Sequence, residues 1–247
     1  LDAPEPERGN LELDGRGDIE LSGVGYAYGD RSVLGGANAT IARGSLVALV
    51  GERGGGKSTL AGIIAGRKDA YRGKVRIGGV ELRDATAASL MRAVTLVPTN
   101  GYPFAGTLRE NLLLAKPDAT DAELLHALDR TRVAAFVQAN GGLDMVINEG
   151  GTNLSGGQRQ RVCMARALLH DSPIYVFDEA TSNVDAASEA AIGEVIASLA
   201  GDHTVIVVAH RLSTIVNADQ ILVLERGRIA ERGTHDMLLA DAGVYAR

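Results

Sequence analysis

The chain has 247 residues, 45% of them hydrophobic, which is enough for one large α/β domain with a buried core. Its formal net charge of −6 argues against nucleic acid as the main partner, because a phosphate backbone requires a basic face. The single cysteine, Cys163, excludes a disulfide framework within the chain, as is typical of a reducing compartment.

Residues 1–17 are charged and rich in Gly and Pro without a sustained periodicity, so we expect a linker there. From Asp18 on, the first half predicts short strands over 19–21 and 24–28, a buried strand over 45–50, a helix over 58–66, a hairpin over 75–82 and a buried strand over 94–97. The second half predicts a helix over 118–139, buried strands over 173–177 and 204–209, and a hairpin over 220–229. Because buried strands alternate with helices, we predict an α/β fold with a mostly parallel core sheet.

A glycine-rich stretch follows the predicted strand over 45–50. Its sequence, Gly51-Glu52-Arg53-Gly54-Gly55-Gly56-Lys57-Ser58, fits the phosphate-loop pattern G-x-x-x-x-G-K-[ST] between a strand and a helix. Glycines let the backbone curl so that successive N–H groups face one anion, and the helix presents its positive N-terminal end to the same anion. Lys57 can reach the β- and γ-phosphates, and Ser58 can offer its hydroxyl to Mg²⁺. The loop alone predicts a nucleotide-binding enzyme or switch.

Two carboxylates follow the predicted strand over 173–177. Asp178 and Glu179 stand at the carboxyl end of this strand, where ligands bind in open α/β sheets. Asp178 is suited to hold Mg²⁺, and Glu179 could polarise an attacking water as a general base. Acidic residues also favour helix N-termini, so the pair alone fits a structural role equally well. Its occurrence together with the phosphate loop favours the catalytic interpretation.

A second anion site is predicted in the middle of the chain. Leu154-Ser155-Gly156-Gly157-Gln158 precedes a helical stretch over 159–169, and a serine with two glycines at a helix start can bind an anion. One nucleotide does not need two phosphate cradles from the same chain. We therefore expect this LSGGQ segment to serve a nucleotide bound by another subunit.

With the phosphate loop upstream and the acidic strand downstream, the LSGGQ segment resembles that of ABC-transporter nucleotide-binding domains, and the resemblance extends from about Asp18 onward. It implies an ABC domain over 18–247 with the P-loop NTPase fold: a mostly parallel core sheet, an N-terminal antiparallel β subdomain, and a helical subdomain over about 100–170 that carries LSGGQ. It also implies ATP and Mg²⁺ as ligands. Two ATP molecules would lie in a head-to-tail dimer, each between one subunit's phosphate loop and the other's LSGGQ segment.

The resemblance assigns roles to further residues. Tyr28 matches an aromatic that stacks on adenine, with a packing role in its strand as the alternative. Asp185 matches a loop that crosses the dimer interface. His210 matches a histidine that contacts the γ-phosphate and positions the attacking water, and it forms the catalytic set with Glu179 and Lys57. The implied nucleotide-binding residues are Tyr28, Gly51, Gly54, Gly55, Gly56, Lys57, Ser58, Thr59, Thr99, Asp178, Leu154, Ser155, Gly156, Gly157, Gln158 and Asp185, with Ser58 and Asp178 as metal ligands.

One position departs from the family pattern. Thr99 stands where the family has a glutamine that touches Mg²⁺ and the attacking water and links the site to the membrane domains. A threonine hydroxyl is too short to replace that amide, whereas Asn100 offers an amide one residue later. We therefore expect altered coupling between transport and hydrolysis, or substitution by Asn100.

Three segments resemble exporter-type members of the family. Residues 104–111 resemble the start of the helical subdomain, 148–151 resemble a loop that touches the membrane domains, and 1–5 resemble the linker after the last membrane helix. No apolar run approaches the roughly 20 residues needed to span a bilayer. The resemblance thus implies an ATPase domain cut from a transporter at the cytoplasmic face of the cell membrane. Its partners would be transmembrane domains and a second ABC domain.

These features favour an active transport motor, which closes as a dimer on ATP and reopens after hydrolysis. Glu179 and His210 favour the motor, whereas Thr99 leaves room for a regulatory half of an asymmetric heterodimer that hydrolyses ATP weakly. Soluble ABC ATPases that act on DNA or ribosomes carry a long coiled-coil insertion or two ATPase domains, and neither occurs in this sequence. The choice between a homodimer and a heterodimer stays open.

Overall fold

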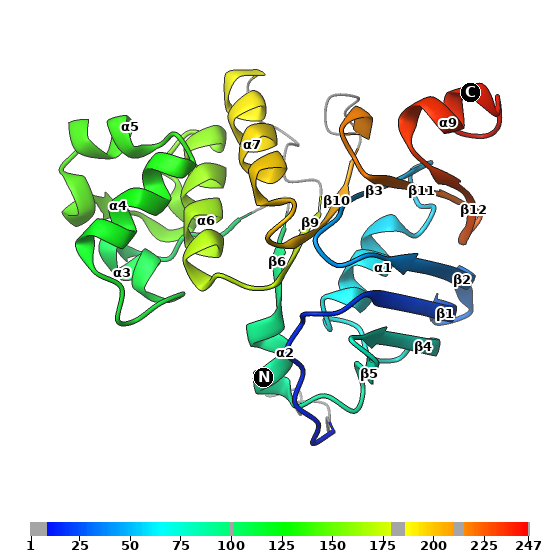
Figure 1. The fold of residues 1–247 in the computed structure, drawn as a ribbon. Coiled ribbons are helices and arrows are strands. Elements are labelled where there is room, and N and C mark those ends of the chain that lie inside the picture. Colours follow the sequence, from blue (N-terminus) through cyan, green and yellow to red (C-terminus); the bar gives the residue numbers. More distant parts are fainter. Residues whose placement is uncertain (1–8, 99–100, 179–185, 210–214, 247) are drawn as a thin grey trace. The chain divides into compact units, whose positions relative to one another are not determined.

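The computed structural model describes residues 9–98, 101–178, 186–209 and 215–246. The chain divides into two compact units (Figure 1). Unit 1 comprises Leu1–Leu96, Ser172–Asp178 and Ala200–Arg247, and unit 2 comprises Val97–Asp171 and Glu179–Leu199. The chain therefore enters unit 2 twice and returns to unit 1 each time.

The first sheet of unit 1 is antiparallel, with the strand order β2-β1-β4-β5. Its strands are β1 (Ile19–Tyr28), β2 (Arg31–Ile41), β4 (Arg72–Ile77) and β5 (Val80–Glu81). Buried and more exposed residues alternate in the second halves of β2 and β4, because one face of the sheet packs on the core. The predicted N-terminal antiparallel subdomain is confirmed, and so is the hairpin predicted over 75–82, which β4 and β5 form.

The second sheet has the strand order β12-β11-β3-β10-β9-β6. Its strands are β3 (Leu46–Gly51), β6 (Val94–Val97), β9 (Ile174–Asp178), β10 (Thr204–Val208), β11 (Gln220–Glu225) and β12 (Arg228–Gly233). β11, β3, β10 and β9 pair in parallel, and β12 joins β11 in antiparallel fashion. Nearly every residue of β3, β9 and β10 is buried, as in sheets covered on both faces. The prediction of a mostly parallel core sheet is confirmed.

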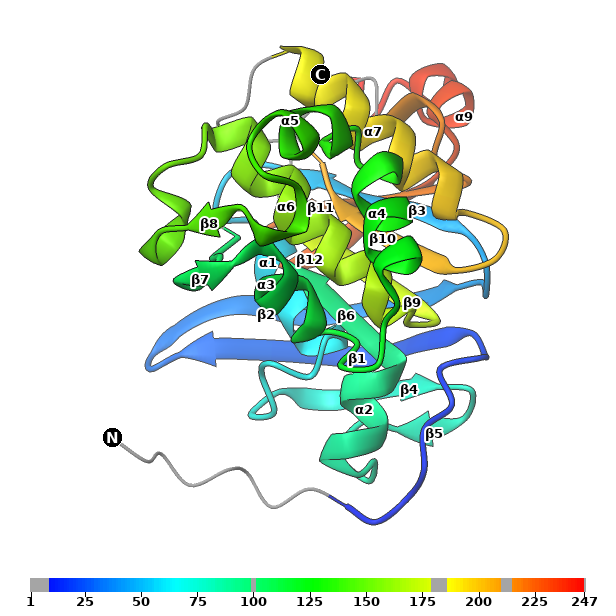
Figure 2. The same cartoon turned by 90° about the vertical axis from the view of Figure 1, so that its left-hand side faces the viewer.

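Helix α1 (Lys57–Ile64) lies between the two sheets of unit 1 (Figures 1 and 2). Leu60, Ile63 and Ile64 of this helix share one core with Val75 of the first sheet and Ile206 of the second. Burying each such side chain contributes about 1.5–3 kcal/mol. This core fixes the start of α1, where the chain arrives from β3. Unit 1 also contains α2 (Ala87–Ala93) and α9 (His235–Ala240).

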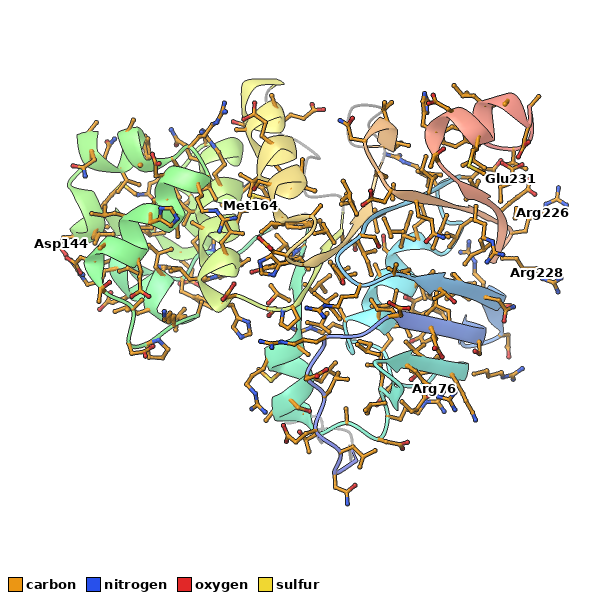
Figure 3. The ribbon with its side chains drawn as sticks, in the orientation of Figure 1. Arg76, Asp144, Met164, Arg226, Arg228 and Glu231 are labelled. Atoms are coloured by element: carbon orange, nitrogen blue, oxygen red, sulfur yellow. The ribbon has the colours of Figure 1, made fainter. Side chains whose placement is uncertain are left out.

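The turn between β11 and β12 brings the two sheets of unit 1 together. Arg226 and Gly227 adopt left-handed conformations there, with φ of 48° and 76°, as the predicted hairpin over 220–229 requires. A Cβ on Gly227 would lie 2.4 Å from the carbonyl oxygen of Val33, and the N–H of Gly35 donates to the carbonyl of Gly227 at 2.8 Å. Glycine therefore permits the close approach of β2. Arg226 points outward from this turn (Figure 3).

The described part of the predicted linker, 1–17, lies against unit 1. The N–H groups of Gly9 and Leu11 donate to the carbonyl oxygens of Arg83 and Asp84, at 3.0 and 2.8 Å. These bonds join the segment to unit 1, and Leu13 of the segment belongs to the core of that unit.

Unit 2 is a group of helices with its own hydrophobic core, drawn mainly in green in Figures 1 and 2. Its elements are β7 (Gly106–Thr107), α3 (Leu108–Leu113), α4 (Asp121–Arg130), α5 (Ala134–Ala139), η1 (Gly142–Asp144), β8 (Val146–Ile147), η2 (Glu149–Gly151), α6 (Gly156–His170) and α7 (Ala186–Leu199). The predicted helical subdomain that carries LSGGQ is confirmed. None of the helices in the described ranges combines the length and the apolar character needed to cross a membrane.

The single helix predicted over 118–139 is wrong, because α4 and α5 are separate helices. Arg132 lies between them with φ of 54°, a left-handed conformation that ends a helix. Leu128 and Val133 on either side of the break both belong to the core of unit 2, so the apolar spacing continues across it. Periodicity alone therefore could not reveal the break.

Candidate functional site

The phosphate loop, residues 51–58, connects β3 to α1. Its backbone is in the left-handed region at three glycines: Gly51 (φ 134°), Gly54 (φ 77°) and Gly56 (φ 99°). A Cβ on Gly51 would lie 2.0 Å from the carbonyl oxygen of Leu224, and one on Gly56 would lie 2.6 Å from Cδ2 of Leu34. Only glycine fits these two positions without a shift of the surroundings. A curl of this kind at a helix N-terminus is the arrangement in which backbone N–H groups bind phosphate.

Lys57 follows the loop glycines and is only 5% exposed. Its ammonium donates hydrogen bonds to the carbonyl oxygens of Gly51 and Glu52, both at 2.8 Å. The positive charge is thus held inside the loop by the loop's own carbonyl groups. An anion that enters the loop meets this charge in a partly desolvated setting, where Coulomb attraction is stronger than in water.

Ser58 of α1 and Asp178, the last residue of β9, meet beside the loop. The Ser58 hydroxyl donates to Oδ1 of Asp178 at 2.8 Å. A hydroxyl and a carboxylate are the hard oxygen ligands that Mg²⁺ prefers, and nucleotide sites supply one or two of them while phosphate and water fill the rest. Within the described ranges, no three His, Cys, Asp or Glu residues form a metal-binding cluster. The donor set fits a metal that arrives with a nucleotide.

Tyr28 is the last residue of β1, and 49% of its surface is exposed. Its hydroxyl lies 3.5 Å from Oγ1 of Thr59 in α1, and its ring packs edge-on against Tyr26 with centroids 5.0 Å apart. Thr59 directly follows Ser58, so the ring stands beside the phosphate loop. An exposed ring at this place is suited to stack on a base, and its exposure argues against a purely packing role. Lys68 contacts the same ring. It lies outside every sequence motif, so the sequence predicts no role for it.

The LSGGQ segment begins α6 in unit 2. Leu154 is buried in the core of unit 2, and Ser155 is the N-cap of the helix. The Ser155 hydroxyl accepts a hydrogen bond from the N–H of Gln158 at 3.2 Å, and the Gln158 side chain accepts one from the N–H of Ser155 at 2.9 Å. This capping box fixes the first turn. The N–H groups of Gly156 and Gly157 stand at its positive end, where an anion can bind.

Two segments that resemble exporter sequences meet in unit 2. The Tyr102 hydroxyl donates to the Glu149 carboxylate at 2.5 Å, and the Arg166 guanidinium donates to the carbonyl of Tyr102 at 3.1 Å. Arg166 also lies over the ring of Phe104, 5.5 Å from its centroid. Tyr102 and Phe104 pack edge-to-face and are each 49% exposed. Tyr102 lies just before the exporter-like segment 104–111, and within that segment the N–H of Ala105 donates to the Glu149 carboxylate at 3.4 Å.

The structure thus gathers Tyr28, the phosphate loop, Thr59 and Asp178 in unit 1, and places LSGGQ in unit 2. Four predicted site residues, Thr99, Glu179, Asp185 and His210, lie outside the described residues.

Comparisons with known proteins agree with this geometry. A family model described as ABC transporter matches residues 34–182. An uncharacterized ABC transporter ATP-binding protein of Haemophilus influenzae is 39% identical over 250 residues, covering 100% of this chain and 45% of that protein. The ATP-dependent lipid A-core flippase of Salmonella typhimurium is 44% identical over 248 residues, covering 98% of this chain and 43% of that protein.

A solved structure gives the same result. A bacterial Atm1-family ABC exporter with ATP bound matches with a TM-score of 0.90 and 37% sequence identity, over 99% of this chain and 43% of the exporter chain. The chain therefore spans less than half the length of these relatives.

Proposed function

Because this chain belongs to the ABC transporter family, as an ATP-binding domain of the exporter type, we propose that it binds ATP with Mg²⁺ and hydrolyses it at sites shared by two such domains. Hydrolysis then drives a substrate across a membrane through transmembrane domains. The observation that carries this proposal is the bond between Ser58 and Asp178 beside the loop that holds Lys57. It brings the proposed metal ligands next to the proposed phosphate ligands.

Each residue of the site has a distinct task in this proposal. The N–H groups of the loop and the Lys57 ammonium bind the β- and γ-phosphates, and Ser58 and Asp178 hold Mg²⁺. The metal supplies charge neutralisation for the phosphates when it is bound. Glu179, next to Asp178, takes the proton of the attacking water, and His210 contacts the γ-phosphate and orients that water. Tyr28 stacks on adenine.

The second cradle comes from another ABC domain in a head-to-tail dimer. The N–H groups at the start of α6, with Ser155, would bind the γ-phosphate held by the partner's phosphate loop. Asp185 would lie at the interface between the two domains. This division would account for the two predicted anion sites of the chain, one in each unit.

The exposed aromatic side chains of unit 2 are the proposed contact with the transmembrane domains. Tyr102 and Phe104 are held by Glu149 and Arg166, and aromatic residues with arginine are enriched in protein interfaces. In this proposal residues 1–17 link the membrane part to the ABC domain over 18–247. The domain then works at the cytoplasmic face of the cell membrane.

The test is the ATPase rate of the chain as a function of its concentration. The specific rate should rise with protein concentration, because each site needs Ser155 and Gly157 of a partner. Glu179→Gln should abolish hydrolysis and form a dimer with ATP that light scattering detects, since the general base is lost while both cradles remain. Lys57→Ala should neither hydrolyse ATP nor dimerise with it. ATP binding with hydrolysis that does not depend on concentration would contradict the shared site.

The second candidate is a regulatory half of an asymmetric heterodimer, favoured by Thr99 in place of the family's glutamine. In that case the chain binds ATP, yet its ATPase rate stays negligible at every concentration. Thr99→Gln in the full transporter should change substrate-stimulated hydrolysis if this position weakens coupling, and an unchanged rate would remove that hypothesis.

A further inference from the structure

The ring of Tyr28 is in contact with a lysine that lies outside every nucleotide-binding motif. Nζ of Lys68 is 4.9 Å from the centroid of the Tyr28 ring and 5.5 Å from that of Tyr26. Both distances are within the range of a cation–π contact, about 6 Å. The two rings meet at 70°, so one ammonium touches both members of an edge-to-face pair. Lys68 therefore restrains the relative orientation of the two tyrosines.

The stem of Lys68 lies next to α1. Gly62 has no side chain, and the stem occupies the space beside it: a Cβ added to Gly62 would lie 3.4 Å from Cε and 3.6 Å from Cδ of Lys68. Gly62 is a buried position of α1, the helix that begins at the phosphate loop. The lysine thus runs along the same helix that carries Lys57, Ser58 and Thr59, and this places its ammonium between the helix and the end of β1.

The ammonium also acts on the hydroxyl of Tyr28. The interaction of the Lys68 ammonium with this hydroxyl, followed by that of Thr59, holds the pKa of Tyr28 below the ordinary value, and the same interaction raises the pKa of Lys68. The lysine is therefore cationic at neutral pH. Three neighbours, Lys68, Tyr26 and Thr59, hold the ring, and nearly half of its surface remains open.

We propose that Lys68 is a positioning residue of the nucleotide site, which holds the ring of Tyr28 in a fixed orientation so that a purine base can stack on its open surface. The inference rests on the proposed function. A ring that is fixed in advance loses less conformational freedom when the base binds. The engagement of the ammonium with the ring and hydroxyl of Tyr28 argues against a role in binding phosphate.

The test compares a ligand that has a base with one that lacks it. The Kd values of ATP and of inorganic tripolyphosphate are measured by calorimetry, both with Mg²⁺, for the wild type and for Lys68→Met. This variant keeps an apolar stem and removes the charge. The Kd of ATP should rise by up to about two- to fivefold, because the preorganisation that is lost cannot exceed the energy of one exposed cation–π contact. The Kd of tripolyphosphate should not change. Lys74→Met, on the exposed part of β4, is the matched control and should change neither value.

A second readout follows Tyr28 directly. The chain has no tryptophan, so tyrosinate absorbance can be titrated, and subtracting the curve of Tyr28→Phe isolates Tyr28. Lys68→Met should shift this titration to higher pH, and in a Tyr28→Ala background it should no longer affect ATP binding. An equal loss of affinity for both ligands would make Lys68 a phosphate ligand and overturn the inference, as would unchanged ATP binding. If the wild type bound neither ligand, the proposed function itself would fail.

Discussion

At the scale of single residues, removing the hydroxyl of Ser58 should weaken the binding of Mg²⁺ without weakening the binding of phosphate. Ser58→Ala should raise the Kd of ATP roughly 10- to 100-fold with Mg²⁺ present, since an interaction with a charged group contributes about 1.5–3 kcal/mol. In EDTA the Kd should hardly change, because Lys57 and the loop N–H groups remain. Calorimetry under both conditions measures this, with Ser58→Thr as the control that keeps the hydroxyl. Equal losses with and without Mg²⁺ would count against a metal role.

The same scale shows what a sequence can and cannot predict about a site. Gly51 and Gly56 are predictable because no other residue fits their backbone, and this constraint fixes the spacing of the motif. The contacts of Lys68 with Tyr28 and of Tyr102 with Glu149 join distant segments. No local pattern indicates such a meeting, because it depends on how the elements pack. The roles of Glu179 and His210 stay predictions.

At the scale of elements, Ser155 caps α6 and has a proposed role in binding the partner's ATP, and substitutions can separate these two roles. Ser155→Ala removes the N-cap and should lower the free energy of unfolding by about 1 kcal/mol. Ser155→Asp should keep the stability, because aspartate caps helices as well as serine and favours the helix dipole. Its carboxylate would nevertheless repel the γ-phosphate and prevent ATP-dependent dimer formation. Thermal melting and light scattering measure the two effects, with Ser155→Asn as a neutral cap. A Ser155→Asp variant that dimerised normally with ATP would argue against the second cradle.

The elements also differ in how far the sequence predicts them. The strands β3, β9 and β10 are predictable because a strand covered on both faces is a short, continuous apolar run. The break between α4 and α5 is not, because Arg132 takes a left-handed conformation that a local motif does not require. The core of unit 2 accepts side chains from both helices, so the tertiary packing decides where one helix ends.

At the scale of the whole molecule, the fold follows from the alternation of strands and helices, whereas the division into units does not. β9 lies between two segments of unit 2 in sequence, yet it belongs to the sheet of unit 1 and brings Asp178 to Ser58. In sequence, the first segment of unit 2, Val97–Asp171, therefore separates Ser58 from Asp178, the two proposed metal ligands. The LSGGQ segment, with its proposed anion site, belongs to unit 2.

This separation leads to a prediction about mixtures of defective chains. Lys57→Ala removes the ammonium of the phosphate loop, and Ser155→Asp places a repelling carboxylate at the start of α6. Each variant by itself should therefore hydrolyse almost no ATP. In a head-to-tail heterodimer of the two variants, one shared site has both defects and the other has none. An equimolar mixture should then recover up to about half of the wild-type rate, because only the mixed pair can close on ATP and it has one of its two sites intact. The matched control mixes Lys57→Ala with Asp178→Asn, which both affect the loop side, and should recover nothing. If each chain completed its own site, neither mixture would gain activity, and the steady-state ATPase rate of the first mixture decides between the two arrangements.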